Sequence, residues 1–158
     1  MSTENQKFLA VSVTKIMAED VPIVSLGENV KGAAALMEKK DYGCLIVIDE
    51  DIAVGMVTES DIVLKVTAEA VDPTKVLVQD IMSSPLISVT ASASVKDAAE
   101  EMSTFNVRKL VVTDDSGRLV GLVTSIDLAK WLASQENYSD VTLNALAKLG
   151  PLKDSPYV

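Results

Sequence analysis

The sequence contains no histidine and a single cysteine. Without histidine, a Ser-His-Asp or Cys-His catalytic arrangement cannot be built. A zinc site would depend on carboxylates and one thiol, which is an unusual ligand set. One cysteine also excludes an internal disulfide. These absences leave carboxylates as the main groups available for acid–base chemistry.

Basic residues are also scarce, because 14 Lys and Arg against 23 Asp and Glu give a net charge of −9. This charge repels the phosphate backbone of nucleic acids and anionic membrane surfaces. No apolar run approaches the roughly 20 residues that a membrane-spanning helix needs. The N-terminal MSTENQKFLAV lacks the basic start and long apolar centre of a secretory signal. We expect a cytoplasmic protein that binds neither nucleic acid nor membranes.

An internal duplication is the main feature that is present. The segment VGMVTESD near the end of the first copy recurs as VGLVTSID in the second. Likewise VTKIM, VKGAAALM and LIVID of the first copy correspond to VQDIM, VKDAAEEM and LVVTD. Such copies usually stack so that each covers the apolar face of the other. The expected division is a first repeat over 11–67, a connector over 68–75, a second repeat over 76–135, and a C-terminal helix and tail over 136–158.

Each copy predicts the element order β-α-β-β-α. Val30, Ala33 and Met37 recur at helical spacing after Asn29, a good N-cap residue, and Ser94 precedes the matching helix of the second copy. Short β-branched runs joined by acidic turns predict a hairpin in each copy. The expected strands are 23–25, 45–48, 52–57, 88–90, 110–113 and 119–123, and the expected further helices are 59–67, 125–134 and 141–149.

In both copies T-x-x-D leads into the last helix, as Thr58 with Asp61 and as Thr124 with Asp127. One interpretation is structural, because a threonine before a helix with an acid three residues later is a variant of the capping box. The other interpretation is functional. The threonine hydroxyl and the N–H groups of the helix start suit a phosphate, and the carboxylate suits a ribose diol. The pair therefore points to a nucleotide more than to a bare anion.

These motifs together resemble a tandem pair of cystathionine β-synthase (CBS) domains, the regulatory module that is also found in inosine monophosphate dehydrogenase. The matching marks are IM near each start, V-K-x-A-A-x-x-M, L-x-V-x-D, and G-h-V-T-x-x-D with h apolar, and they cover about residues 11–134. The resemblance implies an α/β fold of two repeats related by a pseudo-twofold axis and packed as one compact module. It also implies two clefts between the repeats that often hold adenine nucleotides.

The resemblance further implies which residues contact a ligand. In the family the T-x-x-D carboxylate binds ribose hydroxyls, and residues after IM and at the head of the middle strand hold the base. Arg108 and Lys109 stand where the family places basic residues against phosphate, although a solvated strand end is the alternative interpretation. We favour the cleft that they serve as the better site. The residues expected to line this first cleft are Met17, Asp20, Pro22, Tyr42, Gly43, Arg108, Lys109, Thr124 and Asp127. The residues expected to line the second cleft are Thr58, Asp61, Met82, Pro85, Ile87 and Val107.

Other conspicuous residues have mainly structural interpretations. We expect Cys44 to fill a core and Trp131 to pack in a core or a subunit contact. Tyr42 either stacks on adenine or simply packs. The acidic turn DED after the first middle strand is expected to be solvated and not to bind a metal.

The leading hypothesis is a module without catalysis or a cofactor of its own that senses an adenine nucleotide, AMP in the first place and ADP or ATP in the second. The resemblance also implies a homodimer through the helices and a regulated enzyme or transporter as partner. Three alternatives stay open: a sensor of S-adenosylmethionine or another adenosyl ligand, a ligand-free protein adaptor, and a small enzyme that works through Asp61 and Asp127.

Overall fold

The computed structural model describes residue 7 and residues 10–134. In this part of the chain the β-α-β-β-α order occurs twice, which confirms the predicted α/β fold with two repeats. The structure divides into two compact units, which we name after their T-x-x-D acids. The Asp61 unit is Asp20–Leu86, and the Asp127 unit is Met1–Glu19 together with Ile87–Val158. The helix predicted at 141–149 lies outside the described residues.

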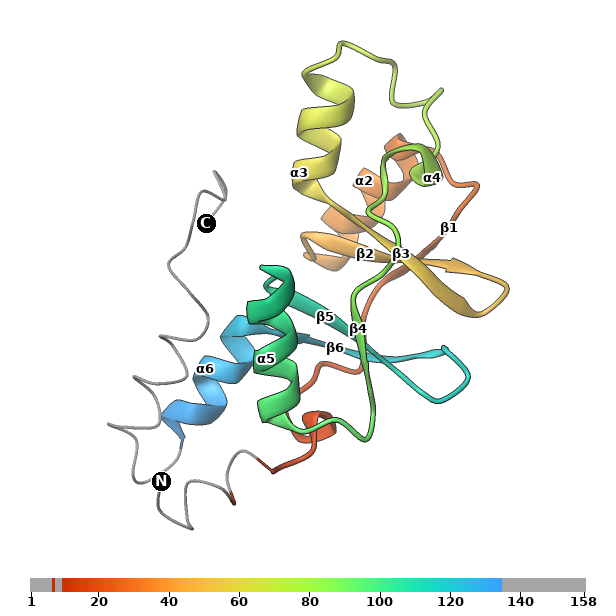
Figure 1. Cartoon of the computed structure of the whole chain (residues 1–158). Helices are drawn as coiled ribbons and strands as arrows, with labels where there is room; N and C mark the ends of the chain where they lie inside the picture. The colour runs from red at the N-terminus through yellow and green to blue at the C-terminus, as the bar shows by residue number, and fades with distance from the viewer. Residues whose placement is uncertain (1–6, 8–9, 135–158) are drawn as a thin grey trace. The chain divides into compact units, whose positions relative to one another are not determined.

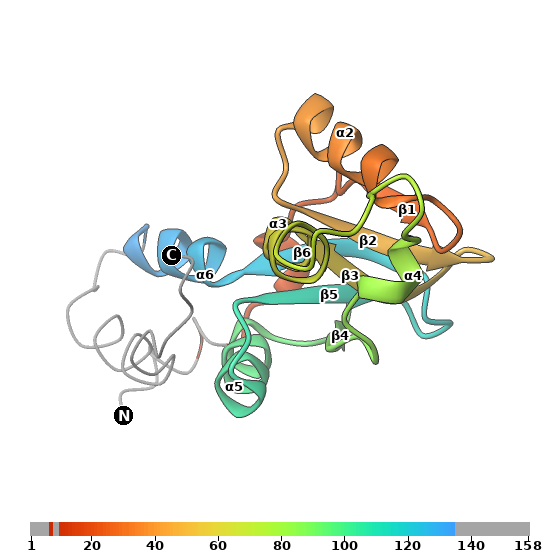
Figure 2. The same ribbon diagram turned by 90° about the horizontal axis from the view of Figure 1, so that it is seen from above.

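The Asp61 unit contains a three-stranded sheet in the order β1-β2-β3. β1 runs parallel to β2 and β3 antiparallel to it, as a β-α-β crossover followed by a hairpin requires. Figures 1 and 2 show α2 lying along one face of this sheet. The elements are β1 (Ile23–Ser25), α2 (Val30–Lys40), β2 (Cys44–Asp49), β3 (Ile52–Thr58), α3 (Glu59–Ile62), the π-helix η2 (Val63–Thr67) and α4 (Val78–Ile81).

The Asp127 unit repeats this topology with the sheet β4-β5-β6 and α5 on one face. The two hairpins share an irregularity at the same place, between Val47 and Ile48 in one and between Val112 and Thr113 in the other. The elements are η1 (Val13–Lys15), β4 (Ser88–Thr90), α5 (Val95–Phe105), β5 (Lys109–Thr113), β6 (Leu119–Thr124) and α6 (Ser125–Ala133).

Each unit has its own apolar core. On α2 the positions predicted from helical spacing, Val30, Ala33 and Met37, are buried against Leu45 and Val47 of β2. The Asp127 unit is built in the same way, and Trp131 packs against its core as expected. The buried members there are Val13, Val89, Val95, Ala98, Met102, Leu110, Val112, Val123 and Leu128.

Both long helices begin at the predicted caps. The Asn29 side chain accepts a hydrogen bond from the Gly32 N–H at 2.9 Å. Ser94 and Asp97 form a full capping box, in which the Ser94 hydroxyl accepts from the Asp97 N–H and the Asp97 carboxylate accepts from the Ser94 N–H. These contacts satisfy N–H groups that the first helical turn leaves without partners.

The first segment of each sequence repeat pairs with a strand of the other repeat. Ala18 exchanges hydrogen bonds of 2.8 and 2.9 Å with Leu122 in the Asp127 unit. In the Asp61 unit, Ser83 exchanges bonds of 2.8 and 3.2 Å with Met56. The structural units and the sequence repeats therefore differ at these two segments.

The glycine of each repeated segment, Gly55 in VGMVTESD and Gly121 in VGLVTSID, allows this pairing. A Cβ at Gly55 would lie 2.7 Å from the sulfur of Met82 and 2.9 Å from the carbonyl oxygen of Ser83. A Cβ at Gly121 would lie 2.6 Å from the sulfur of Met17. Only glycine leaves room for so close an approach of a neighbouring segment.

The helices that follow the two hairpins differ. α6 is a regular α-helix, whereas α3 continues into the π-helix η2. There the Ala68 N–H donates to the Val63 carbonyl at 2.8 Å and the Val71 N–H to the Val66 carbonyl at 3.0 Å, both five residues back. Such wide turns are uncommon and are often found at functional sites.

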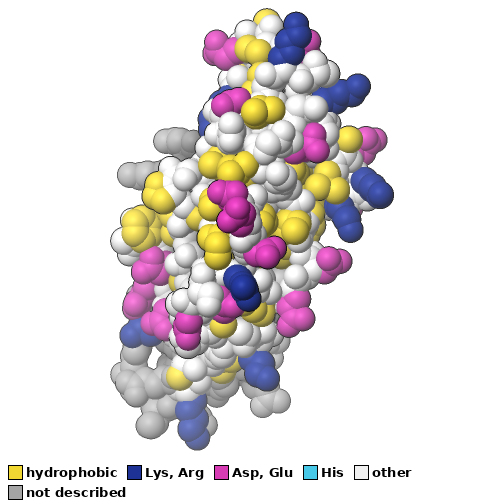
Figure 3. All heavy atoms as spheres, turned by 90° about the vertical axis from the view of Figure 1, so that its right-hand side faces the viewer, with side chains coloured by type: hydrophobic (Ala, Val, Ile, Leu, Met, Phe, Trp, Pro, Cys, Tyr) yellow, Lys and Arg dark blue, Asp and Glu magenta, His cyan; other side chains and the backbone are white. Residues whose placement is uncertain are grey.

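Figure 3 shows acidic side chains spread along the face that it draws, with basic side chains between them. Among the described residues, no helix combines the length and the apolar character needed to cross a membrane.

Candidate functional site

The T-x-x-D motifs lie at two strand–helix junctions. At the Asp61 junction β3 leads into α3, and at the Asp127 junction β6 leads into α6. Both motifs form capping boxes. Asp61 Oδ2 accepts from the N–H of Thr58 at 2.9 Å and from its hydroxyl at 3.0 Å. Asp127 Oδ2 accepts the same two bonds from Thr124, each at 2.8 Å. The threonine oxygens in turn accept from the acids' N–H groups, both at 3.2 Å. The structural interpretation of the motif is therefore confirmed, and it uses one carboxylate oxygen of each acid.

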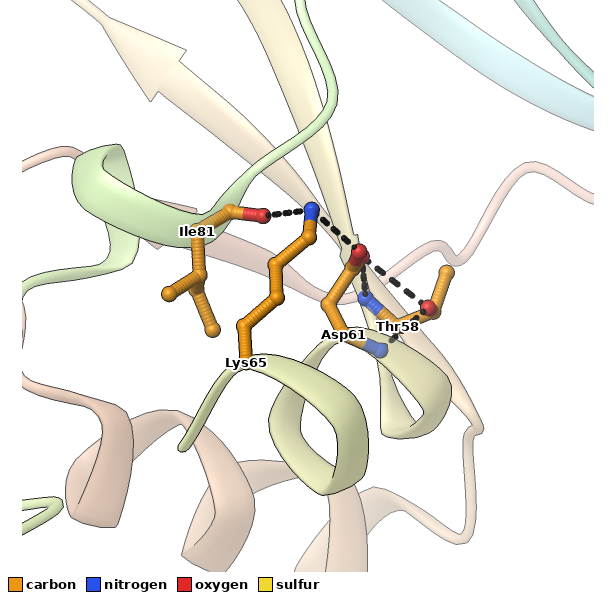
Figure 4. A network of polar contacts seen from close by, with 4 residues as sticks. All are labelled: Thr58, Asp61, Lys65 and Ile81. Carbon is orange, nitrogen blue, oxygen red and sulfur yellow. Dashed lines mark hydrogen bonds and ion pairs between the residues drawn. The ribbon is translucent and has the colours of Figure 1, made fainter. Parts of the chain in front are cut away.

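The second oxygen of Asp61 is also occupied. Lys65 Nζ lies 2.8 Å from Asp61 Oδ1 and donates a hydrogen bond of 2.7 Å to the carbonyl of Ile81, at the end of α4 (Figure 4). The Asp61 side chain is 12% exposed and that of Lys65 46%. Both oxygens of this carboxylate thus have partners within the Asp61 unit.

The Asp127 carboxylate has no such partner among the residues that the structure describes. The residue four places after it is Trp131, where the Asp61 unit has Lys65. Lys130 is exposed and forms no salt bridge with a described residue. Within 10–134, the Oδ1 atom of Asp127 accepts no hydrogen bond. The only interactions of this carboxylate there are the two with Thr124, so one oxygen is available to a ligand that donates hydrogen bonds.

The head of each middle strand faces the threonine of the motif. Lys109 pairs directly with Thr124 across β5 and β6, and Cys44 pairs with Thr58 across β2 and β3. Directly opposite residues of an antiparallel pair project from the same face of the sheet, about 5 Å apart at Cβ. The Lys109 side chain forms no salt bridge with any described residue, and Cys44 is buried at 1% exposure. One junction thus carries a cation where the other carries a buried thiol.

The first residue of the helix at each junction, Ser125 in α6 and Glu59 in α3, adds to this difference in charge. In the Asp127 unit the Ser125 N–H donates to the Arg108 carbonyl at 2.9 Å. In the Asp61 unit the Glu59 N–H donates to the Gly43 carbonyl at 3.1 Å. The Glu59 carboxylate reaches within 3.2 Å of the position that a Gly43 Cβ would take. A phosphate is therefore attracted at the first of these junctions and repelled at the second.

The residues predicted to share a site fall in both units, so their assembly around one ligand stays a prediction. Of the first set, Met17, Arg108, Lys109, Thr124 and Asp127 belong to the Asp127 unit, and Asp20, Pro22, Tyr42 and Gly43 to the Asp61 unit. Of the second set, Thr58, Asp61, Met82 and Pro85 belong to the Asp61 unit, and Ile87 and Val107 to the Asp127 unit.

Several of these residues have structural roles as well. Met17, Ile87 and Val107 are partly buried against the core of the Asp127 unit, and Met82 against that of the Asp61 unit. Pro22 is buried, and its carbonyl accepts a hydrogen bond from the Ile46 N–H at 3.0 Å. Packing therefore accounts for these five members of the two sets, whereas Pro85 of the second set is exposed.

Two residues that shape the junctions, Lys65 and Glu59, are absent from the sequence-based sets. The spacing of Asp61 and Lys65 is a signal that could have found the first, because an acid and a lysine four residues apart meet on a helix surface. Glu59 directly follows the threonine, so its proximity to Gly43 follows only from the pairing of β2 with β3.

An apolar groove of about 510 Å³ lies beside α2 in the Asp61 unit. It contains none of the residues predicted to bind a nucleotide, and Lys31 is the one charged side chain in its otherwise mainly apolar lining. Its lining is Val30, Lys31, Ala34, Ile62, Val66, Thr67, Ala70, Val71 and Pro73.

Metal ligands do not gather in the described structure. Over residues 7 and 10–134, no group of three or more Asp, Glu or Cys side chains is placed to hold an ion. In the acidic turn after β2, Asp49, Glu50 and Asp51 are all exposed, which agrees with a solvated turn.

Comparison with known proteins finds CBS domains at residues 13–67 and 78–134. The CBS domain-containing protein YhcV of Bacillus subtilis is 32% identical over 133 residues, which are 84% of this chain and 94% of that protein. The uncharacterized protein MK0525 of Methanopyrus kandleri is 34% identical over 120 residues, which are 75% of this chain. The match spans 61% of that relative's length. The crystal structure of the CBS domain protein TA0289 of Thermoplasma acidophilum is similar at a TM-score of 0.71 and 27% identity, over 87% of this chain and 75% of that one.

Proposed function

The chain belongs to the CBS domain family as a tandem regulatory pair, and from this premise we propose that it binds an adenine nucleotide at its T-x-x-D junctions without catalysing a reaction. AMP is the preferred ligand, with ADP and ATP as longer variants. The Asp127 junction is the better of the two sites.

One observation carries this proposal. Asp127 keeps one carboxylate oxygen that accepts no hydrogen bond from a described residue, and Lys109 lies opposite Thr124 in the same junction. A ribose diol donates two hydrogen bonds and suits the carboxylate. A phosphate suits the ammonium group and the N–H groups at the start of α6. A nucleotide carries both groups on one molecule.

Titration of the whole chain with AMP in a calorimeter tests the proposal. Asp127→Ala should weaken AMP binding by about thirtyfold, because a hydrogen bond to a charged group contributes about 2 kcal/mol. Asp97→Ala is the matched control, since it also removes the acid of a capping box in the Asp127 unit, on α5. It should leave AMP binding unchanged.

Three results would refute this proposal. AMP binding that survives Asp127→Ala at full strength would place the ligand elsewhere. Binding of none of AMP, ADP, ATP or S-adenosylmethionine would favour a protein adaptor. Turnover of the nucleotide during the titration would indicate an enzyme.

S-adenosylmethionine is the second candidate, and Glu59 favours it. The sulfonium of this ligand is cationic, so the carboxylate beside Gly43 attracts it, whereas Lys109 repels it. Binding at the Asp61 junction would be lost in Asp61→Ala and kept in Asp127→Ala, the reverse of the pattern expected for AMP.

The wider parts of the proposal follow from the family resemblance. The chain self-associates as a homodimer through its helices, is located in the cytoplasm, and controls an enzyme or a transporter in response to the nucleotide.

A further inference from the structure

Lys65 makes two contacts at the Asp61 junction that have no counterpart among the described residues of the Asp127 junction. Its ammonium group lies between Asp61 Oδ1, at 2.8 Å, and the Ile81 carbonyl, at 2.7 Å (Figure 4). It therefore ties the helix after β3 to the end of α4 while neutralising the carboxylate. The capping box uses Asp61 Oδ2, and Lys65 contacts the other carboxylate oxygen, Oδ1.

We infer that Lys65 occupies the place of the ribose diol at the Asp61 junction, so that the chain binds one nucleotide, at Asp127, and not two. This inference rests on the proposed function, because it assigns to the T-x-x-D acids the binding of ribose. A diol that donates to Asp61 Oδ1 must compete for this oxygen with a charged donor, and both partners of that donor lose a hydrogen bond if it is displaced.

The surroundings of the two junctions agree with this division. Trp131 stands at the position of Lys65 in α6 and packs against the core, so it offers Asp127 no charge. Cys44 replaces Lys109 at the strand head, and Glu59 adds a negative charge beside Gly43. The Asp61 junction therefore lacks the free acid for a ribose and the cation for a phosphate.

Site-resolved NMR of the ¹⁵N-labelled whole chain, titrated with adenosine, tests this inference. Adenosine carries the diol but no phosphate, so the difference between Lys109 and Glu59 has little influence on the result. In the wild type, the amide signals of Thr124 and Asp127 should shift and saturate before those of Thr58 and Asp61. Lys65→Met should lower the half-saturating concentration at the Asp61 junction by about tenfold, because the diol no longer competes with an ion pair and its hydrogen bonds.

The chain offers a matched control in Lys96, which pairs with Glu100 at 3.6 Å across the same four-residue spacing on α5. Lys96→Met removes a half-exposed ion pair of the same kind and should change neither half-saturating concentration. If Lys65→Met does not fold, Lys65→Gln keeps a donor for the Ile81 carbonyl while removing the charge, and it should shift the Asp61 junction in the same direction.

The outcomes separate the two proposals. Equal saturation of both junctions in the wild type, or no change at Thr58 and Asp61 in either Lys65 variant, would overturn the role of Lys65 and leave nucleotide binding at Asp127 intact. Absence of any adenosine-dependent or AMP-dependent shift at Thr124 and Asp127 would overturn the proposed function, and the inference with it.

Discussion

A methyl group added at Gly55 should destabilise the protein by about 2 kcal/mol. The new Cβ would lie 2.7 Å from the sulfur of Met82 and 2.9 Å from the carbonyl oxygen of Ser83. The thioether can rotate away, but the carbonyl is held because Ser83 and Met56 exchange two hydrogen bonds. Either the overpacked contact persists, at about 1–3 kcal/mol, or the two bonds weaken, at about 1 kcal/mol each.

Gly27→Ala is the matched control within the Asp61 unit, because a Cβ there meets no atom within 4 Å. Its backbone is outside the left-handed region, so alanine fits without strain. Urea unfolding followed by circular dichroism gives the free energy of unfolding of both variants. A Gly55→Ala protein within about 0.5 kcal/mol of Gly27→Ala would refute the claim that this glycine is required for close approach.

Two further predictions concern charge. Ser94 donates two hydrogen bonds that lower the pKa of Asp97 below 3.8, and the bond from its N–H has a larger effect than the bond from its hydroxyl. A carboxylate with a depressed folded-state pKa stabilises the protein above its unfolded pKa, and the contribution is lost as the pH falls through the folded value. Asp97→Asn should therefore cost about 1 kcal/mol of unfolding free energy at pH 7 and much less near pH 2, and an equal cost at both would contradict the cap. Lys109→Met should weaken AMP about tenfold in calorimetry but leave adenosine unchanged, since only AMP carries the phosphate; an equal loss for both would argue against a phosphate contact.

Sequence patterns alone predicted the features that depend on neighbours three or four residues apart. The caps at Asn29 and Ser94 and the buried stripe of α2 are confirmed, because capping and helical periodicity are settled within one or two turns. The T-x-x-D motif left both its interpretations open, since the same local geometry serves a cap and a ligand.

The tertiary structure decided which segments meet. That Ala18 pairs with Leu122, and Ser83 with Met56, follows from hydrogen bonds between distant parts of the chain, which no local pattern encodes. The same holds for the Lys65 ammonium, whose second acceptor, the Ile81 carbonyl, belongs to a segment beyond the connector. The nearly identical segments VGMVTESD and VGLVTSID thus have different surroundings. The charge around a carboxylate depends on every element that packs against it and not only on the motif that contains it.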